Sequence, residues 1–396
     1  MSLLLTPPSP PRPRLARRFL AWLLVAAVLV TLAAFVARSV LIQQMRLPRL
    51  AIDQGSNVIA VAIAPDGKTI FAGSDPTRDA MRTMGNKSAD VFVYQATSGR
   101  LIRRLHGFYW RSNAVTPSPD GQAVLASGYA HPDDPSPKTF QASQVFAWNW
   151  HSGQRLWEIA GKMPLSYSPD GRFVGSADGI HKAATGKLLV RIPRGLSPDS
   201  QSAFSPDGKL FGFIGRGTLN EKEVADSDDG DRLYYSTPRL HLWQTDTGKE
   251  AEDFPFTRAR AFDLARTGQW LVMVADRGSM GGGTDGSVVR RVDITTGAVS
   301  WTRERSYNAP SHDPDAFLNS IVVSPNGKYV IIQSPSSQLI VLDASTGREL
   351  FRPFTHQGRG EPGWALPGGL AFSADGRTLV SRCGSKVLVW DASSLR

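Results

Sequence analysis

One four-residue turn recurs seven times along this chain. Each copy lies between two short runs of hydrophobic, β-prone residues. Proline and aspartate favour a turn and glycine supplies a positive φ, so each copy predicts a β-hairpin. The final glycines are separated by 37 to 60 residues. The copies read APDG at 64–67, SPDG at 118–121, 168–171 and 205–208, ARTG at 265–268, SPNG at 324–327 and SADG at 373–376.

A second signature follows each turn: a strand that ends in a Ser/Thr-Gly turn. Each repeat therefore predicts four strands, which we call a to d, joined at a–b and c–d by short turns. A period of this length is typical of β-propeller blades. We predict an all-β, seven-bladed β-propeller of four-stranded antiparallel blades. The second signature lies at 91–99, 145–153, 179–186, 240–248, 288–297, 339–347 and, without the glycine, 387–395.

The last repeat is incomplete. The sequence stops at Arg396, just after strand c of the seventh repeat. Before the first repeat, residues 46–53 (RLPRLAID) form a surplus apolar stretch of strand length. Propellers close by letting strands from the two ends of the chain share one blade, which removes exposed edges. We expect this N-terminal strand to complete the seventh blade.

Over residues 46–396 the chain resembles the WD40 and WD40-like (SPDG-repeat) propellers. Segments 151–157, 293–301 and 343–351 also look like the D-x-x-T-G-x-x-x-W repeat of quinoprotein-type propellers. The Gly-His pair of WD40 blades is not repeated here, and Trp-Asp occurs only at 390–391. The chain has one cysteine, so the adjacent cysteine pair often found over a quinone cannot exist. We expect no cofactor.

Residues 19–36 form an 18-residue stretch without charge. As a helix it would reach about 27 Å, close to the thickness of a bilayer core. A cleaved signal peptide has a shorter apolar stretch, and the cleavage sites here are poor. We therefore prefer a transmembrane helix at 19–36, after a disordered, basic, proline-rich tail (1–18) and before a linker (37–45) and the propeller (46–396). A cleaved signal and a buried helix remain alternatives.

Charge places the propeller outside the cytoplasm. Four arginines precede the apolar stretch and three (Arg38, Arg46 and Arg49) follow it, which favours a cytoplasmic N-terminus. We expect a single-pass membrane protein of a bacterium whose propeller is periplasmic or extracellular. Residues 1–44 contribute +5 of the net +10, leaving 10 − 5 = +5 for the rest. That small excess gives no reason to expect nucleic acid.

The long insertions indicate where a partner would bind. All of them fall in b–c or d–a connections, which share one face of the disc, and long loops on a rigid scaffold usually carry binding. Exposed aromatic and arginine side chains are typical anchors of a protein interface. The partner-binding candidates on this face are Tyr129, Tyr234, Tyr235, Trp364 and Arg359. The insertions span 73–90, 128–143, 215–238, 276–286, 303–317 and 353–369.

Metal binding is the weaker interpretation of the same loops. Asp226 and Asp228 lie in an acidic stretch, but Ala225 and Ser227 break the D-x-D-x-D-G spacing of a calcium loop. A solvated acidic loop explains them better. Three histidines of the insertion face could meet over the central channel, but they belong to blades that are not all adjacent. We expect no metal site. The three are His131, His312 and His356.

No catalytic constellation is recognisable, so we do not expect an enzyme. The sequence predicts a membrane-anchored scaffold that binds proteins through its b–c/d–a loop face. One alternative is a sensor or hydrolase-type propeller with a small-ligand or metal site at the channel mouth, and another is a purely structural domain. Neither the partner nor the oligomeric state can be deduced from the sequence, because propellers host many functions.

Overall fold

The structure is a computed structural model, and the chain divides into two compact units, Met1–Gln44 and Met45–Arg396. In the first unit Trp22 and residues 25–29 are described, and they are helical. In the second unit the described residues are 47–75, 89–130, 143–161, 165–192, 197–216, 238–251, 258–278, 284–306, 318, 320–334, 338–353 and 369–395.

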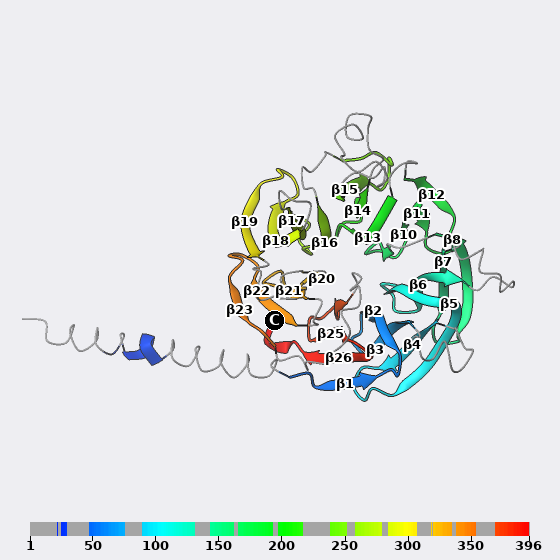
Figure 1. Ribbon diagram of the computed structural model, residues 1–396, viewed down its shortest axis with the longest axis horizontal. Coiled ribbons are helices and arrows are strands. Elements are labelled where there is room, and N and C mark those ends of the chain that lie inside the picture. Colours follow the sequence, from blue (N-terminus) through cyan, green and yellow to red (C-terminus); the bar gives the residue numbers. More distant parts are fainter. Residues whose placement is uncertain are drawn as a thin grey trace, which may run out of the picture. The chain divides into compact units, whose positions relative to one another are not determined.

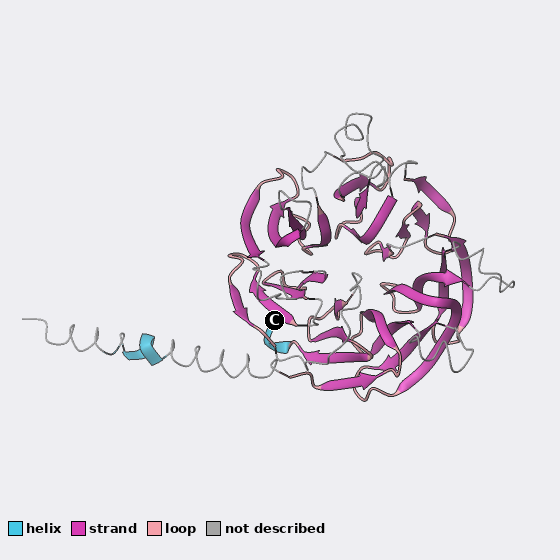
Figure 2. Cartoon of the chain, in the orientation of Figure 1, coloured by secondary structure: helices cyan, strands magenta, loops and turns pink. Residues whose placement is uncertain are grey.

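The second unit is built from strands that form six sheets around one axis (Figures 1 and 2). One sheet has seven strands and spans blades 1 and 2, so the six sheets make seven blades. Strand a of each blade is innermost. Blade 1 contains β2 (Asn57–Ile63), β3 (Thr69–Asp75), β4 (Ala89–Gln95) and the first part of β5 (Leu101–Pro117). Blade 2 contains the rest of β5, β6 (Ala123–Ala130), β7 (Ser143–Asn149) and β8 (Gln154–Ala160). Blade 3 contains β9 (Ser166–Tyr167), β10 (Phe173–Ser176), β11 (Gly179–Lys182) and β12 (Leu188–Arg191).

The remaining four blades have the same order. Blade 4 contains β13 (Ser197–Phe204), β14 (Leu210–Arg216) and β15 (Arg239–Gln244). Blade 5 contains β16 (Ala259–Leu264), β17 (Trp270–Gly278), β18 (Thr284–Asp293) and β19 (Val299–Ser306). Blade 6 contains β20 (Ser320–Val323), β21 (Tyr329–Gln333), β22 (Leu339–Asp343) and β23 (Glu349–Phe351). Blade 7 contains β24 (Leu370–Phe372), β25 (Thr378–Cys383) and β26 (Lys386–Asp391), followed by a short 3₁₀ helix, Ser393–Leu395.

The first strand closes the ring as the sequence predicts. β1 (Leu50–Asp53) pairs antiparallel with β26, with Leu50 opposite Val389 and Asp53 opposite Lys386. It is the fourth strand of blade 7. Ile52 points into the core and is 7% exposed, whereas its neighbour Ala51 is exposed. The alternation matches a strand with one buried face.

Two blades differ from the predicted plan. β5 runs without a break from blade 1 into blade 2, because residues 101–117 are rich in β-formers and contain no proline before Pro117. In blade 4 the described residues form three strands, and an isolated bridge between Trp243 and Glu250 stands where the fourth would pair. Residues 252–257, where the rest of a fourth strand would lie, are outside the described residues.

Five of the seven a–b turns share one side-chain hydrogen-bonding design, and Ala64 and Ala265 replace its serine in blades 1 and 5. In blade 4 the Ser205 hydroxyl donates to Asp207 (2.6 Å) and accepts the N–H of Leu210 (2.9 Å), while Asp207 accepts the N–H of Lys209 (3.1 Å). The Ser205 hydroxyl and the Lys209 N–H hold the pKa of Asp207 below its ordinary value. The final glycines of all seven turns have φ between 70° and 72°. This left-handed conformation suits glycine.

Neighbouring blades are joined at the outer strands. In five places a side chain of strand d lies against the glycine of the next blade's c–d turn, where a Cβ would come within 2.6–3.1 Å of it. Trp157 and Trp301 also donate their Nε1–H to the carbonyls of Ala183 (2.8 Å) and Ala344 (2.9 Å). Glycine at this turn position therefore permits close blade packing. The five pairs are Ile52–Gly99, Arg103–Gly153, Trp157–Gly186, Val190–Gly248 and Trp301–Gly347.

The predicted transmembrane helix lies mostly outside the described residues. Within the part of the chain that the structure describes, no helix has the length and apolarity to cross a bilayer. The helix over 19–36 stays a prediction.

Candidate functional site: the insertion face

Strand direction separates the two ends of every blade. Strands a and c run toward one face, which holds the a–b and c–d turns and which we call the turn face. The b–c and d–a connections join strand ends at the opposite face, the insertion face. All of the long connections join strands there, as predicted. Five of them, bounded by the observed strands, span 76–88, 131–142, 217–238, 307–319 and 352–369. The insertion predicted at 276–286 is a short connection at 279–283 instead, because β17 and β18 pair as far as Gly278 and Thr284.

The strand ends beneath the blade 1 insertion are fixed by polar contacts. The buried Ser74 hydroxyl donates to the carbonyl of Asp90 (3.0 Å) and accepts its N–H (2.9 Å). The Asp90 carboxylate lies 2.9 Å from Nδ1 of His106. Arg111, at the start of blade 2, donates to Asp75 through Nε (3.2 Å) and Nη2 (2.9 Å). The strand ends on both sides of connection 76–88 are therefore held rigidly by these contacts.

Blades 5 and 6 repeat this arrangement with other residues. At the ends of β16 and β17, Arg260 forms an ion pair with Asp276. The buried Ser287 hydroxyl, at the start of strand c, accepts the N–H of Leu318 (3.0 Å). This bond ties blade 5 to the entry of blade 6, on both sides of the 307–319 connection.

A half-buried arginine joins blades 6, 7 and 1 at this face. Arg382 of β25 donates through Nη1 to the carbonyl of Val58 (3.3 Å), and its own carbonyl accepts Nε2 of Gln333 (2.7 Å). Burial lowers the pKa of Arg382 to about 10, so it is still a cation at neutral pH. The N–H of Gly369 donates to the Ser320 hydroxyl (3.2 Å), and a Cβ on Gly369 would collide with the Gln333 amide. The repeat patterns did not point to Arg382, although an arginine inside a β-prone hairpin strand is a visible signal.

The innermost strands carry polar side chains that bridge adjacent blades. Asp263 of β16 accepts the N–H groups of Val323 in blade 6 (2.7 Å) and Leu264 (2.9 Å). Gln201 accepts the N–H of Phe262 (3.0 Å). Burial raises the pKa of Asp263 to about 6 in spite of both backbone donors. Because its two oxygens serve backbone N–H groups, Asp263 acts as a structural bridge.

The predicted site residues divide between described and undescribed parts. Tyr129 is half-buried at the end of β6, next to the 131–142 connection. The other partner-binding candidates, Tyr234, Tyr235, Trp364 and Arg359, lie outside the described residues, and so do His131, His312, His356, Asp226 and Asp228. Their proximity to one another stays untested, and a binding role for any of them is a proposal.

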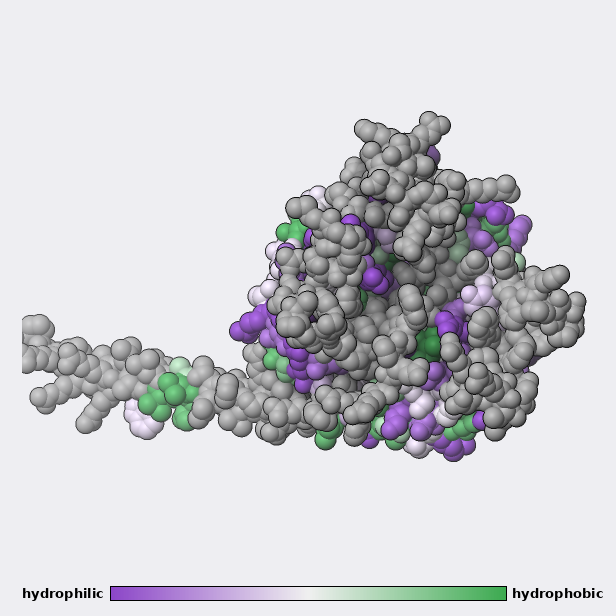
Figure 3. Space-filling view, viewed as in Figure 1, coloured by the Kyte–Doolittle hydropathy of each residue, from purple (hydrophilic) through white to green (hydrophobic). Residues whose placement is uncertain are grey.

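The described surface offers little else as a binding patch. Figure 3 shows a mainly hydrophilic rim with small, separate apolar areas. Apart from Leu47, which precedes β1, the exposed aliphatic side chains of the described propeller residues lie on the outer strands of different blades, and single exposed side chains of this kind are common on protein surfaces. They are Leu101, Ile102, Leu156, Leu189 and Val299.

In the described part of the propeller, no set of side chains is suited to bind a metal ion or a quinone of the cysteine-pair type. There, no three His, Cys, Asp or Glu side chains form a group that could hold a metal ion. The cysteine of the chain, Cys383, is single and half-buried, so a cysteine pair over a quinone is excluded. The residues do not fit a quinone of that type.

Comparisons with known proteins agree with the fold. A family model described as outer membrane protein assembly factor BamB matches residues 220–362. The hydrazine synthase of Kuenenia stuttgartiensis is similar in structure, with a TM-score of 0.61 at 15% identity, over 86% of this chain and 96% of that chain. No curated protein matches the sequence. The family match supports a likeness to quinoprotein-type propellers over residues 220–362, and the structural likeness concerns the β-propeller fold alone.

Proposed function

We propose that this protein is a membrane-tethered propeller that binds a protein partner through its insertion face. The observation that carries the proposal is that the long connections join strands at one face, where polar contacts fix the flanking strand ends. A rigid base with variable loops is the arrangement on which proteins commonly build recognition surfaces. Of the predicted anchors, Tyr129 stands at the edge of this base.

The matching family model supports a role in protein assembly. Its description names an outer membrane protein assembly factor, and its match begins within the longest insertion. Residues 217–237 hold six acids and two bases, a net charge of 2 − 6 = −4. A partner surface with basic side chains would complement this loop and associate with it faster at low salt.

The first strand of the propeller begins on the turn face. β1 is the outer strand of blade 7 and starts there, as every strand d does. The propeller would stand in the periplasm or outside the cell, according to the arginines that flank residues 19–36.

Crosslinking in intact membranes tests the proposed face. We would compare the full-length protein with one variant in which residues 217–237 are replaced by a short Gly-Ser linker, and a second shortened at 354–368. The matched control is Lys209→Glu with Arg377→Glu, which changes exposed turn-face charges and leaves the insertions intact. We expect a specific crosslinked protein with the wild type and the control, and its loss in the loop variants.

Other outcomes would overturn the proposal. A partner that survives both loop variants and is lost in the control binds the turn face instead. Recovery of no specific protein, together with a metal or small molecule in the purified chain, favours the ligand-binding alternative. For the tether, Val28→Arg should release the protein from membranes washed at alkaline pH, because a charge in a bilayer core is costly. Release of the wild type by the same wash would contradict a retained anchor.

A further inference from the structure

One strand of blade 5 breaks the pattern that the other six blades share. Arg291 of β18 lies opposite Val272 of strand b. At the equivalent position of strand c every other blade has an aliphatic residue that is at most 2% exposed. An aliphatic side chain therefore suffices for blade packing at this position. The six equivalents are Val93, Ala147, Ile180, Leu242, Val341 and Val389.

The contacts of Arg291 leave its hydrogen-bonding capacity incompletely used. Its guanidinium carbon lies 4.3 Å from the centre of the Trp270 ring. Nη1 donates to the carbonyl of Ala344 (3.3 Å), which also accepts the Trp301 indole N–H (2.9 Å). Nε is buried and has no hydrogen-bond partner among the described residues. A buried donor without an acceptor is unfavourable, so packing and this one long hydrogen bond do not explain an arginine here.

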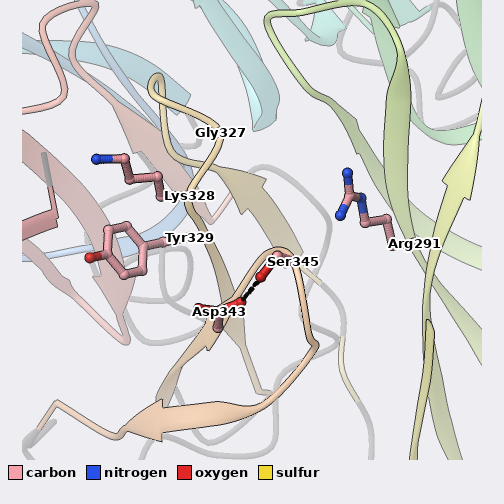
Figure 4. Close-up of a pocket in the computed structure, with 6 residues that line it drawn as sticks. All are labelled: Arg291, Gly327, Lys328, Tyr329, Asp343 and Ser345. Carbon is pink, nitrogen blue, oxygen red and sulfur yellow. Dashed lines mark hydrogen bonds between the residues drawn. The ribbon is translucent and has the colours of Figure 1, made fainter. Parts of the chain in front are cut away.

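The guanidinium faces a pocket of about 260 Å³ on the turn face, at the seam between blades 5 and 6 (Figure 4). Arg291 belongs to blade 5, and the other lining residues belong to blade 6. In Figure 4 Ser345 and Asp343 lie across the space from Arg291, while the Lys328 side chain points away from it. Pockets for drug-sized ligands usually begin near 300 Å³, so this one suits a small group. The lining residues are Arg291, Gly327, Lys328, Tyr329, Asp343 and Ser345.

Charge favours an anion in this pocket. The lining holds two cations and one carboxylate. Oδ1 of Asp343 already accepts the N–H and hydroxyl groups of both Ser345 and Thr346, at 2.6–3.0 Å. The negative charge of Asp343 is therefore largely satisfied by its own turn, whereas the guanidinium of Arg291 still has donors to offer. Arginine binds carboxylate and phosphate oxygens through such donors, often in pairs.

We propose that this turn-face pocket is a binding site for a small oxyanion, a carboxylate or a phosphate group, with Arg291 as its principal ligand. Lys328 adds attraction at longer range. The site is separate from the insertion face, and its test does not depend on the partner proposed there. The competing explanation is that Arg291 is only a strut that stacks on Trp270 and ties blade 5 to Ala344.

Anion titrations of the purified full-length protein in detergent distinguish the two explanations. The probes are inorganic phosphate and succinate, each at constant ionic strength with sodium chloride as the balance. The readouts are the melting temperature and isothermal titration calorimetry. We expect a saturable rise in melting temperature and a measurable binding heat with at least one probe. Binding of phosphate alone or of succinate alone identifies which group the site takes.

Matched variants locate the effect. Arg291→Met keeps an unbranched stem over Trp270 and removes the charge, and we expect it to weaken binding by roughly tenfold or more. Lys328→Glu reverses an exposed charge without touching the core, and we expect a loss of about threefold or more. Arg172 follows the turn glycine of blade 3, as Lys328 follows that of blade 6, and the control variant Arg172→Met should bind the anion as the wild type does.

Three results would overturn the site. The first is no saturable response to either probe beyond that to chloride. The second is wild-type affinity in a folded Arg291→Met variant, which would leave Arg291 as a strut. The third is unchanged affinity in Lys328→Glu, which decides the question should Arg291→Met not fold. Equal weakening by Arg172→Met would point to an adventitious effect of surface charge.

Discussion

The two faces of the propeller differ in how regular their connections are. On the turn face the a–b turns repeat one design, in which each final glycine has nearly the same φ. On the insertion face the connections range from residues 177–178 in blade 3 to 217–238 in blade 4. The c–d turns of the turn face pack against the neighbouring blade at their glycines, so their sequence is constrained. The connections of the insertion face differ in length from blade to blade, and their described ends contact the neighbouring blade at single points, as Leu318 does with Ser287.

Hydrogen-bond partners differ between the faces in the same sense. On the turn face, side chains mainly serve the backbone of their own turn, as Ser205 and Asp207 do. On the insertion face, side chains such as Arg111, Ser287 and Arg382 connect strands of adjacent blades. The difference suggests that turn-face geometry is local, whereas the base of the insertion face depends on an assembled ring.

The largest expected effect tests whether β1 closes the ring by pairing in blade 7. Ile52→Asp places a carboxylate between β1 and the core of blades 7 and 1, where the native side chain is 7% exposed. We expect a loss of about 3–5 kcal/mol in the free energy of unfolding, because a buried unpaired charge is costly. Ala51→Asp, on the exposed side of the same strand, should cost less than about 1 kcal/mol. Urea unfolding followed by tryptophan fluorescence measures both, and equal losses would contradict the closure.

The next effect compares one glycine from each face. Gly347 on the turn face has φ of 69°, and a Cβ there would lie 2.7 Å from the Trp301 ring. Gly384 on the insertion face has φ of 58° and open space around its Cβ position. We expect Gly347→Ala to cost about 3 kcal/mol, from backbone strain and overpacking, and Gly384→Ala about 1 kcal/mol, from strain alone. If thermal and urea unfolding show equal costs, the turn face is no more constrained than the insertion face.

The free energy of unfolding should depend on pH in opposite directions for Asp263 and for the turn-face carboxylate Asp207. Burial raises the pKa of Asp263 to about 6, above its unfolded value, so the folded state holds this proton more tightly. The stability that it contributes is present at pH 4 and lost as the pH rises toward 6, on the order of 2–3 kcal/mol. The pKa of Asp207 is lowered, so its contribution is present above about pH 4 and lost in acid.

The variant Asp263→Asn isolates this dependence. Urea unfolding from pH 4 to pH 7 should show a decline in the wild type that is smaller in Asp263→Asn. The variant loses one acceptor for a backbone N–H, so it should be less stable than the wild type at pH 4. A decline of the same size in both proteins would mean that another group titrates.

Much of the framework could be predicted because it is locally encoded. Each turn glycine, the paired strands around it and the β1 closure are specified by patterns within a few residues. The continuous β5 was missed because Gly107 is the only interruption between Leu101 and Pro117, and whether it breaks the strand depends on its neighbours. In blade 4 the Thr-Gly turn at 247–248 has the ordinary pattern, and the predicted fourth strand beyond Ala251 lies outside the described residues.

The candidate sites were harder to predict, for a different reason. Arg291 and Arg382 stand inside β-prone segments, where a sequence pattern records an arginine but not the pocket or carbonyl that it faces. The insertion loops carry no repeat, so the positions of Trp364 or His312 have no local determinant to read. The contacts of single side chains outside the repeat are therefore less visible in the sequence than the strand pairing that the repeat specifies.

The smallest expected effect tests whether turn-face geometry is local enough to transplant. In blade 1 Ala64 occupies the position of the turn serine and is 2% exposed, while Asp66 still accepts the N–H of Lys68 (2.9 Å). In blade 3 the Ser168 hydroxyl donates to Asp170 (2.6 Å) and accepts the N–H of Phe173 (2.9 Å). Ala64→Ser should supply the same two bonds to Asp66 and Thr69.

We expect Ala64→Ser to raise the free energy of unfolding by about 1 kcal/mol and Ser168→Ala to lower it by about 1–2 kcal/mol. The removal costs more than the addition gains, because it leaves the N–H of Phe173 without its acceptor. Urea unfolding of the two single variants and of the double variant measures both effects and their additivity, which distant turns should show. A destabilising Ala64→Ser would mean that the turn depends on its blade, and the contrast between a locally encoded turn face and an assembled insertion face would then fail.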